Sequence, residues 1–145
     1  MQNVTKIGVV GFSGKPFDIN SATEKLRSIL GRLNTKFNDG DIELVSGYTN
    51  IGIPKIAYEI ADELGMITVG ISAKEALNVD CGLYPVKKKI IVGDHFGDES
   101  DTFIEYIDIL IRIGGGNQSL HEVKLFKQVH NHKQLDDILL EEEVN

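Results

Sequence analysis

The residues best suited to do chemistry lie where an apolar run, residues 107–113, meets three consecutive glycines, Gly114, Gly115 and Gly116. Such a junction is typical of a buried strand that leads into a helix in an α/β protein. Glycines let a ligand approach the main chain closely, and the first N–H groups of the following helix have no partner within it. Because these groups lie at the positive end of the helix dipole, they bind phosphate well. This turn is therefore predicted to form one wall of a nucleotide-type pocket.

Two further glycine-bearing turns also follow apolar runs, residues 6–10 and 42–45. Ligands of open α/β sheets bind outside the carboxyl ends of the strands, so we expect the three turns to converge on one crevice. The first turn matches neither the P-loop nor the GxGxxG motif. The predicted ligand-binding residues are Gly11, Phe12, Ser13, Gly14 and Lys15 of the first turn, Ser46, Gly47, Tyr48, Thr49 and Asn50 of the second, and Gly114, Gly115, Gly116, Asn117, Gln118 and Ser119 of the third.

Several side chains in these turns have an alternative structural role. Lys15 could pair with a phosphate or simply be exposed to solvent. Tyr48 could stack on a base or sugar, or pack within its own loop. Thr49 and Asn50 could hydrogen-bond a ribose or phosphate, or only shape the turn. The sequence leaves these alternatives open.

Glu122 is the candidate catalytic residue, as a general acid or base. The spacing Ser119-x-x-Glu122 is also that of a capping box, in which the glutamate only satisfies an amide at the helix start. His95 is a further candidate ligand contact, because its loop would follow a strand and line the crevice. His95 or Asp94 could assist Glu122 in catalysis.

The same polar stretch suggests a metal site built on Asp94, His95 and either Asp98 or Glu99. The spacing matches no standard metal motif, and acidic residues also favour a helix N-terminus, so no metal is predicted. Cys81 is the single cysteine, which excludes an internal disulfide. We interpret it as a structural thiol rather than a nucleophile.

The hydrophobic pattern alternates between strands and helices along the chain. A capping box at residues 21–24 predicts a helix start, and Gly65 predicts a helix end. The alternation predicts a Rossmann-like three-layer α/β/α fold with a mostly parallel sheet of about five strands and right-handed crossovers. The expected strands are residues 6–10, 42–45, 66–71, 90–92 and 107–113, and the expected helices are residues 21–33, 55–64, 98–106, 120–130 and 135–140.

Length and composition indicate an ordinary globular protein of 145 residues, with 41% hydrophobic residues and a net charge of −7. We expect a single domain over residues 1–145, with a solvated acidic tail at residues 141–145. Without a long basic run, nucleic-acid binding is not expected. No segment is typical of a signal peptide, and no apolar run approaches the ~18 residues of a membrane span. We therefore expect no membrane partner and a cytoplasmic location.

The third turn carries a family resemblance. Residues 114–122 resemble the PGGxGTxxE signature of the SLOG superfamily, with Gly115, Gly116, Ser119 and Glu122 at matching positions. Gly114 replaces the proline of the signature, and Gln118 replaces its last glycine. Residues 46–54 resemble the glycine-bearing loop that faces the ligand after the second strand of these proteins. The superfamily includes LOG-type nucleotide hydrolases, molybdenum cofactor carrier proteins and sensors of nucleotide-derived signals.

This resemblance implies a nucleotide-type small-molecule ligand and a homodimer. LOG hydrolases carry an Arg-Lys pair in the helix before the glycine signature, and that arginine works with the glutamate of the signature. Counting back from Asp108, the corresponding positions hold Glu99 and Ser100. Because neither of these residues is cationic, hydrolysis by the mechanism of LOG hydrolases is not expected.

We therefore predict a binding protein for a nucleotide or nucleotide-derived ligand, without catalysis. The alternatives are a nucleotide or N-glycoside hydrolase that uses Glu122, and a molybdenum cofactor carrier-like protein. A purely structural partner subunit is a further alternative, disfavoured by the three glycine-bearing turns. No cofactor is predicted beyond the nucleotide-like ligand.

Overall fold

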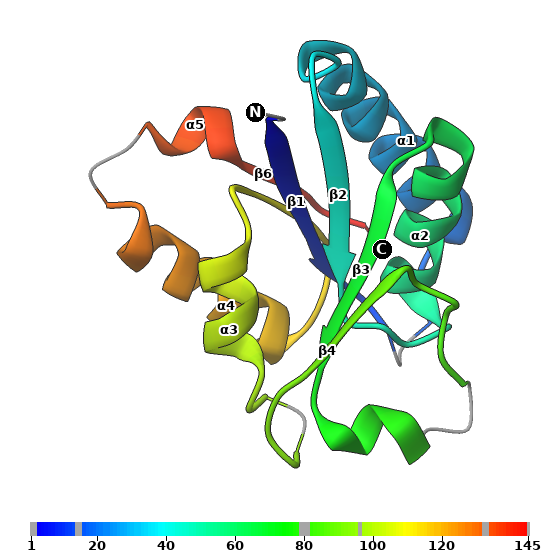
Figure 1. Ribbon diagram of the computed structural model, residues 1–145, viewed down its shortest axis with the longest axis vertical. Coiled ribbons are helices and arrows are strands. Elements are labelled where there is room, and N and C mark those ends of the chain that lie inside the picture. The colour runs from blue at the N-terminus through cyan, green and yellow to red at the C-terminus, as the bar shows by residue number, and fades with distance from the viewer. Residues whose placement is uncertain (1–2, 14–15, 79–81, 96, 132–133, 145) are drawn as a thin grey trace.

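The computed structural model describes residues 3–13, 16–78, 82–95, 97–131 and 134–144 (Figure 1). In this part of the chain, six strands form one sheet in the order β4-β3-β2-β1-β5-β6, and all neighbouring pairs are parallel. The fold is Rossmann-like, as predicted. The strands are β1 (Val4–Gly11), β2 (Asp41–Ser46), β3 (Ile67–Ser72), β4 (Lys88–Ile91), β5 (Ile109–Ile113) and β6 (Leu139–Glu142).

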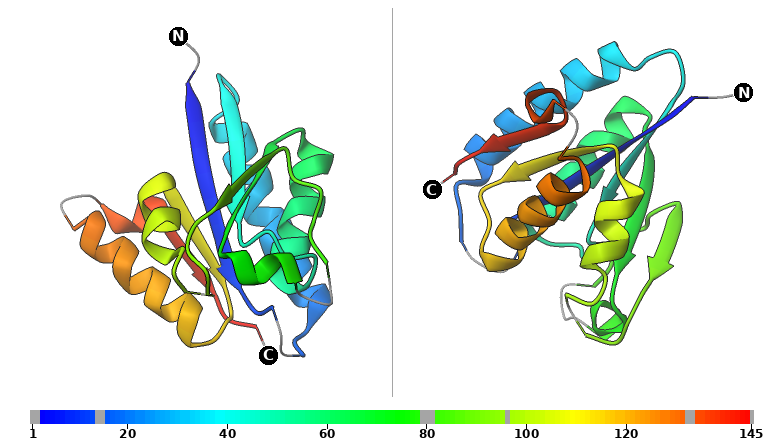
Figure 2. Two further views of the ribbon diagram at one scale, coloured as in Figure 1. Left: turned by 60° about the horizontal axis from the view of Figure 1, so that its bottom comes forward. Right: turned by 90° about the vertical axis from the view of Figure 1, so that its left-hand side faces the viewer.

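Helices cover both faces of the sheet, which gives three layers (Figures 1 and 2). One face packs against α1 (Ile19–Lys36) and α2 (Gly52–Leu64), and the other packs against α3 (Ser100–Tyr106) and α4 (Asn117–Val129). A 3₁₀ helix, η1 (Lys74–Asn78), follows β3, and a short α5 (Leu135–Ile138) precedes β6. None of the helices in the described ranges is long and apolar enough to cross a membrane.

Apolar spacing explains which helix faces are buried. In α1, Leu26, Ile29, Leu30 and Leu33 recur at helical spacing and are buried against the sheet, as predicted. The predicted capping box at residues 21–24 is wrong. Helix α1 begins earlier, and Asp18 is its N-cap, whose carboxylate accepts a hydrogen bond from the Ser21 amide at 3.1 Å.

The carboxyl-terminal segment differs from the prediction. The expected helix over residues 135–140 ends at Ile138, and the chain continues as β6, parallel to β5. The acidic tail is therefore not simply solvated. Glu141 and Glu143 both form ion pairs with Arg112, a buried residue of β5. A buried guanidinium needs charged partners, and the tail supplies them as a sixth strand.

The strand order places a topological switch beside β1. The chain adds β2, β3 and β4 on one side of β1, and then β5 and β6 on its other side. The connections after β1 and β5 therefore diverge to opposite faces of the sheet, which opens a crevice at the carboxyl ends of these strands.

Candidate functional site

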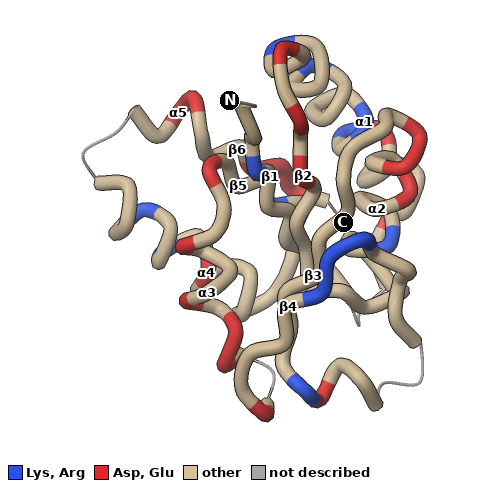
Figure 3. Tube along the Cα trace, in the orientation of Figure 1, with Lys and Arg blue, Asp and Glu red and all other residues tan. Residues whose placement is uncertain are grey.

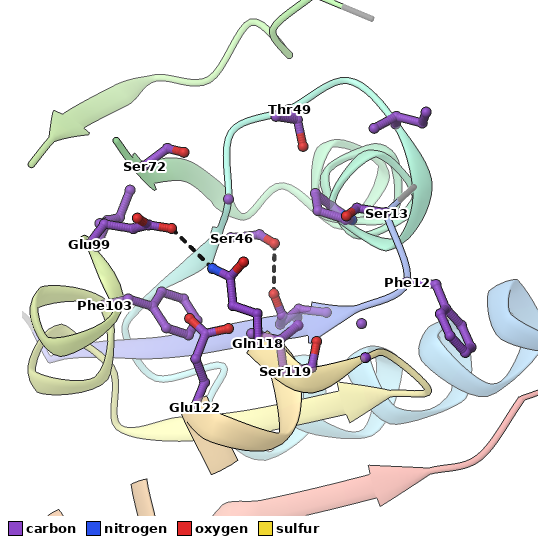
Figure 4. A pocket seen from close by; sticks show the side chains of 18 of the residues that line it. Phe12, Ser13, Ser46, Thr49, Ser72, Glu99, Phe103, Gln118, Ser119 and Glu122 are labelled. Atoms are coloured by element: carbon purple, nitrogen blue, oxygen red, sulfur yellow. Dashed lines mark hydrogen bonds between the residues drawn. The ribbon is translucent and has the colours of Figure 1, made fainter. Parts of the chain in front are cut away.

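A cavity of about 760 Å³ lies at the carboxyl ends of β1, β2 and β3, between the loops that follow β1 and β2 and the start of α4 (Figure 4). Its walls combine apolar side chains, hydroxyl groups and two carboxyl groups. It is lined by Val9, Val10, Gly11, Phe12, Ser13, Ser46, Gly47, Thr49, Ile51, Pro54, Ile71, Ser72, Glu99, Phe103, Gly116, Asn117, Gln118, Ser119 and Glu122.

Residues from all three predicted turns line this cavity. They are Gly11, Phe12, Ser13, Ser46, Gly47, Thr49, Gly116, Asn117, Gln118 and Ser119, together with Glu122. Tyr48, Asn50, His95, Gly114 and Gly115 do not belong to the lining. The predicted Gly14 and Lys15 lie outside the described residues, as does Cys81.

The glycine triplet itself is not an open cradle. The Gly114 amide donates a hydrogen bond to the Glu142 carbonyl of β6 at 2.8 Å, so this donor is already used. Gly115 has a φ of 106°, and a Cβ there would lie 2.6 Å from the Ser119 hydroxyl oxygen. The part of the motif that opens into the cavity is instead Gly116, the N-cap of α4, and the first helical turn. The amides of this turn have no partner within the helix.

The loop after β2 is held in place by buried hydroxyl groups. The Ser46 hydroxyl donates to the Val9 carbonyl at 2.7 Å, which ties the ends of β2 and β1 together (Figure 4). The Tyr58 hydroxyl accepts a hydrogen bond from the Tyr48 amide at 3.1 Å and donates to the Val69 carbonyl at 2.9 Å. Burial raises the pKa of Tyr58, which keeps the hydroxyl proton available for this bond.

Tyr48 belongs to the core rather than to the cavity wall. It is 5% exposed, adopts a φ of 74° and packs its ring over Gly70. Of the two roles open for Tyr48 from the sequence, this structure therefore has the packed loop tyrosine.

Two buried carboxyl groups line the same cavity. Glu122 of α4 and Glu99, the residue before α3, are 6% and 5% exposed. Glu99 accepts hydrogen bonds from the Gln118 amide group at 3.2 Å and from the Gly97 amide at 3.0 Å. Burial raises the pKa of Glu122 to about 8, and the negative charge of Glu99 adds to this effect.

The capping-box interpretation of Glu122 is wrong. Helix α4 begins at Asn117, so Glu122 lies in its second turn, and the N-cap receives no side-chain hydrogen bond. Figure 4 shows the Glu122 carboxyl group directed into the cavity beside Phe103 and Gln118. Glu122 therefore lies in the cavity wall rather than at the helix cap.

His95 and Asp94 lie outside the cavity lining. The His95 ring nitrogen Nδ1 lies 3.2 Å from a Glu75 carboxylate oxygen, and the side chain is 77% exposed. Asp94 pairs with Lys74 at 3.4 Å. Among the described residues, no group of three or more histidine, cysteine or acidic side chains is arranged to hold a metal ion.

Several residues of the cavity were not predicted from the sequence. Phe103 and Ile71 come from a helix and a strand that were predicted correctly, and Ser72 ends β3 one residue beyond the expected strand. Nothing in their local sequence marks these three residues as part of a cavity. For Glu99 the family resemblance gave a signal, because counting back from Asp108 implies that Glu99 corresponds to the arginine of LOG hydrolases. In the structure, Glu99 and Glu122 line the same cavity.

Within the part of the chain that the structure describes, positive charge lies away from the cavity. No lysine or arginine belongs to its described lining. The basic cluster of residues 87–89 leads into β4, whereas acidic residues gather on and before α3 (Figure 3). An anion in the cavity would therefore depend on main-chain N–H groups and hydroxyl groups among the described residues.

The fold and this cavity place the chain among Rossmann-like α/β proteins with a pocket at the strand ends. The molybdenum cofactor carrier protein from Chlamydomonas reinhardtii is similar, with a TM-score of 0.70 and 17% identity over 96% of this chain and 89% of that chain. The molybdenum cofactor binding protein from Rippkaea orientalis has a TM-score of 0.67 and 21% identity over 97% and 78%, respectively.

A third similar structure is TM1055, a structural genomics target, with a TM-score of 0.68 and 21% identity over 86% of this chain and 69% of that chain. No known family model matches this sequence, and no curated protein matches it significantly. Molybdenum cofactor carrier proteins are among the groups that the SLOG resemblance names, so the resemblance is confirmed at the level of the fold.

Proposed function

We propose that this protein binds a nucleotide or a nucleotide-derived small molecule without converting it. The phosphate lies at Gly116 and the first turn of α4, and the rest of the ligand extends toward Glu99 and Glu122. The observation that carries the proposal is the cavity of about 760 Å³ into which the start of α4 opens. Pockets for small ligands typically measure ~300–1,000 Å³.

The walls of the cavity suit both ends of such a ligand. Phe103, Ile71 and Val10 supply apolar surface for a ring system. Near α4, the main-chain N–H groups of the first turn and the Ser119 side chain supply donors for phosphate oxygens. These features support a bound molecule that is apolar in its middle and anionic at one end.

Gly116 offers a clean test of the phosphate position. No atom lies within 4 Å of a Cβ built there, so a side chain fits without a clash. Gly116→Asp places a negative charge at the helix start, whereas Gly116→Asn is its neutral isostere, and both residues are good N-caps. We expect adenosine and guanosine monophosphate to bind the wild type and Gly116→Asn, and to lose at least about tenfold in affinity with Gly116→Asp, as repulsion of roughly 1.4 kcal/mol requires.

The measurement is isothermal titration calorimetry, with a thermal shift as a check of folding. Equal affinity of the Asp and Asn variants would show that the phosphate lies elsewhere. Absence of binding by every nucleotide tested would contradict the proposed function. Gly115→Asp is a poorer test, because the clash with Ser119 perturbs folding by itself.

A second candidate function is hydrolysis of a nucleotide N-glycosidic bond. The observation that favours it is the Glu99–Glu122 pair, because a buried carboxyl with a pKa near 8 beside a second carboxyl suits general acid catalysis. Two observations weigh against hydrolysis. The predicted helpers His95 and Asp94 lie outside the cavity lining, and the resemblance implies that Glu99 replaces the arginine of LOG hydrolases. Free base and phosphosugar, detected by mass spectrometry after incubation with adenosine monophosphate, would support hydrolysis over simple binding.

A third candidate is a molybdenum cofactor carrier-like role. It is supported by similarity to two solved structures whose names state that cofactor, at 17% and 21% identity. The cofactor carries a phosphate and a pterin ring, which suit the two ends of the cavity. Mass spectrometry of small molecules released from the purified protein distinguishes a pterin from a common nucleotide.

A further inference from the structure

The cavity wall carries a pair of carboxyl groups that form no ion pair with any cationic side chain in the described ranges. Glu99 and Glu122 are both more than nine-tenths buried, and both line the cavity. No ion pair joins either of them to a described lysine, arginine or histidine. Buried carboxyl groups without cationic partners are costly, so their retention in a ligand cavity points to a role with the ligand.

We propose that the Glu99–Glu122 pair accepts hydrogen bonds from the end of the ligand that is remote from its phosphate. This end of the ligand is uncharged or cationic and carries adjacent N–H or O–H donors. The proposal rests on the proposed ligand-binding function. Sugar hydroxyl groups and the amino edge of a heterocycle share this chemistry. A second anionic end is rejected, because it would add negative charge beside two carboxyl groups.

The hydrogen-bond inventory supports a donor-rich ligand. Each oxygen of Glu99 already accepts one bond, from Gln118 or Gly97, and retains a second lone pair. The Glu122 carboxyl group points into the cavity (Figure 4), and the Ser100 hydroxyl is a neighbouring donor that partly offsets the rise in its pKa. An ionised carboxylate is an acceptor only, so the partners of this pair must be donors.

Binding of such a ligand is coupled to loss of a proton. At neutral pH, burial and Glu99 keep the Glu122 carboxyl group largely protonated. Ligand donors favour the ionised form, so the O–H proton of Glu122 passes to the buffer on binding. The affinity of the protein for the ligand should therefore increase about tenfold between about pH 7 and pH 9. At the higher pH, Glu122 is already ionised before the ligand binds, so no proton has to be displaced.

The other charged groups near Glu122 do not replace it as the titrating group. On α3, Asp101 and Glu105 are exposed. On β5, Arg112 is engaged by Glu141 and Glu143. On α4 itself, His121 and Lys124 are exposed. Ser100, the first residue of α3, is buried and cannot titrate in this range.

The test is calorimetric titration of the wild type and Glu122→Gln with adenosine monophosphate across this pH range, in buffers of different ionisation enthalpy. Glutamine mimics the protonated side chain, and subtraction of the variant removes the phosphate's own titration. We expect greater proton release and a steeper pH dependence of the affinity in the wild type than in Glu122→Gln, which retains only the contribution of the phosphate. Equal pH dependence in both proteins, or proton uptake by the wild type alone, overturns the proposal.

Two ligand analogues identify the donors. If the coupling disappears with 2′,3′-dideoxyadenosine monophosphate and persists with inosine monophosphate, the sugar hydroxyl groups are the donors. The reverse result assigns the donors to the base, and either result supports the proposal. Binding that requires added Mg²⁺ and disappears in EDTA overturns it, because the carboxyl pair would then hold a cation.

A phosphate-free probe separates this proposal from the proposed function. Acetamidinium carries adjacent N–H donors and a positive charge, and it needs no phosphate site. In an NMR titration, we expect millimolar acetamidinium to lower the titration midpoint of Glu122 in the wild type, whether or not any nucleotide binds. If nucleotides fail and acetamidinium lowers the midpoint, only the proposed nucleotide function is wrong. An unchanged midpoint overturns the role of the carboxyl pair.

Discussion

Two buried glutamates of this protein have opposite surroundings. Glu43 of β2 is 3% exposed and forms hydrogen bonds with Lys88, at 2.7 Å, and with the Tyr106 hydroxyl. Glu122 of α4 is 6% exposed and faces the cavity beside Glu99. Burial alone would raise the pKa of Glu43, but its bonds to Lys88 and Tyr106 outweigh burial and lower it. The pKa of Glu122 is raised to about 8.

The difference separates a carboxylate bound within the fold from a carboxyl group that lines the cavity. Glu43 is satisfied by its neighbours within the fold, and it joins β2 to β4 and α3 through Lys88 and Tyr106. Glu122 lacks a cationic partner among the described residues and lies against open volume. Burial by itself therefore does not mark a candidate functional acid, whereas burial in a cavity without a described cationic partner does.

The largest expected effect is on the pH dependence of stability through Glu122. Its folded-state pKa of about 8 exceeds the ordinary value of 4.5, so the folded state binds this proton more tightly than the unfolded state. The stability that this proton provides is present below the ordinary pKa and is lost as the pH rises toward 8. The slope approaches about 1.4 kcal/mol per pH unit in this window. Urea unfolding should show this loss in the wild type and not in Glu122→Gln; parallel curves would contradict it.

Glu43→Ala should cost about 2 kcal/mol, because it removes a buried acceptor and leaves the Tyr106 hydroxyl without this partner. Glu43 contributes to the pH dependence of stability with a sign opposite to that of Glu122. The stability from Glu43 is present above its ordinary pKa and is lost as the pH falls through its lowered folded value. Urea unfolding at neutral and acidic pH measures both effects. If Glu43→Ala left the free energy of unfolding unchanged, the hydrogen bonds of Glu43 would add nothing to the stability of the fold.

Lys88→Met converts Glu43 into a residue more like Glu122, a buried carboxyl without its cation. We expect the pKa of Glu43 to rise and the stability at neutral pH to fall by less than in Glu43→Ala, because the Lys88 side chain is half exposed and part of its attraction is screened. Lys89→Met on the same strand is the matched control, since no ion pair of Lys89 is found among the described residues. Equal effects of the two variants would assign the loss to strand β4 rather than to the pair.

The smallest effect should come from Glu143→Gln. Glu143 pairs with the buried Arg112, but its side chain is 80% exposed and Glu141 remains as a partner. We expect a loss of stability smaller than that of Lys88→Met in thermal or urea unfolding, because solvent screens this exposed pair. A loss comparable to that of Glu43→Ala would show that exposure does not weaken this ion pair.

Much of the fold follows from the sequence because apolar periodicity records which faces are buried. The first five strands and the buried face of α1 were predicted in this way. Strand β6 was not, because its acidic residues 141–143 have the composition of a solvated tail. Only the position of Arg112 on the neighbouring strand explains why they are ordered. The homodimer implied by the resemblance stays a prediction.

The site was predicted in part, for a similar reason. Glycine-bearing turns are visible in the sequence, and turn residues from all three line the cavity. The sequence does not show which amides are free, and the Gly114 amide is used by β6. Nor does it show that Glu99 and Glu122, far apart in the chain, meet at one end of the cavity. That pairing depends on how α3 and α4 pack on the sheet.

The most direct test of this account is a carboxyl-carbon NMR titration of the wild type, with Glu122 and Glu43 assigned by their glutamine variants. The account predicts a midpoint near pH 8 for Glu122 and a midpoint below 4.5 for Glu43. Midpoints that coincide near the ordinary value would contradict it, because Glu122 would then be neither desolvated nor coupled to Glu99 in the cavity.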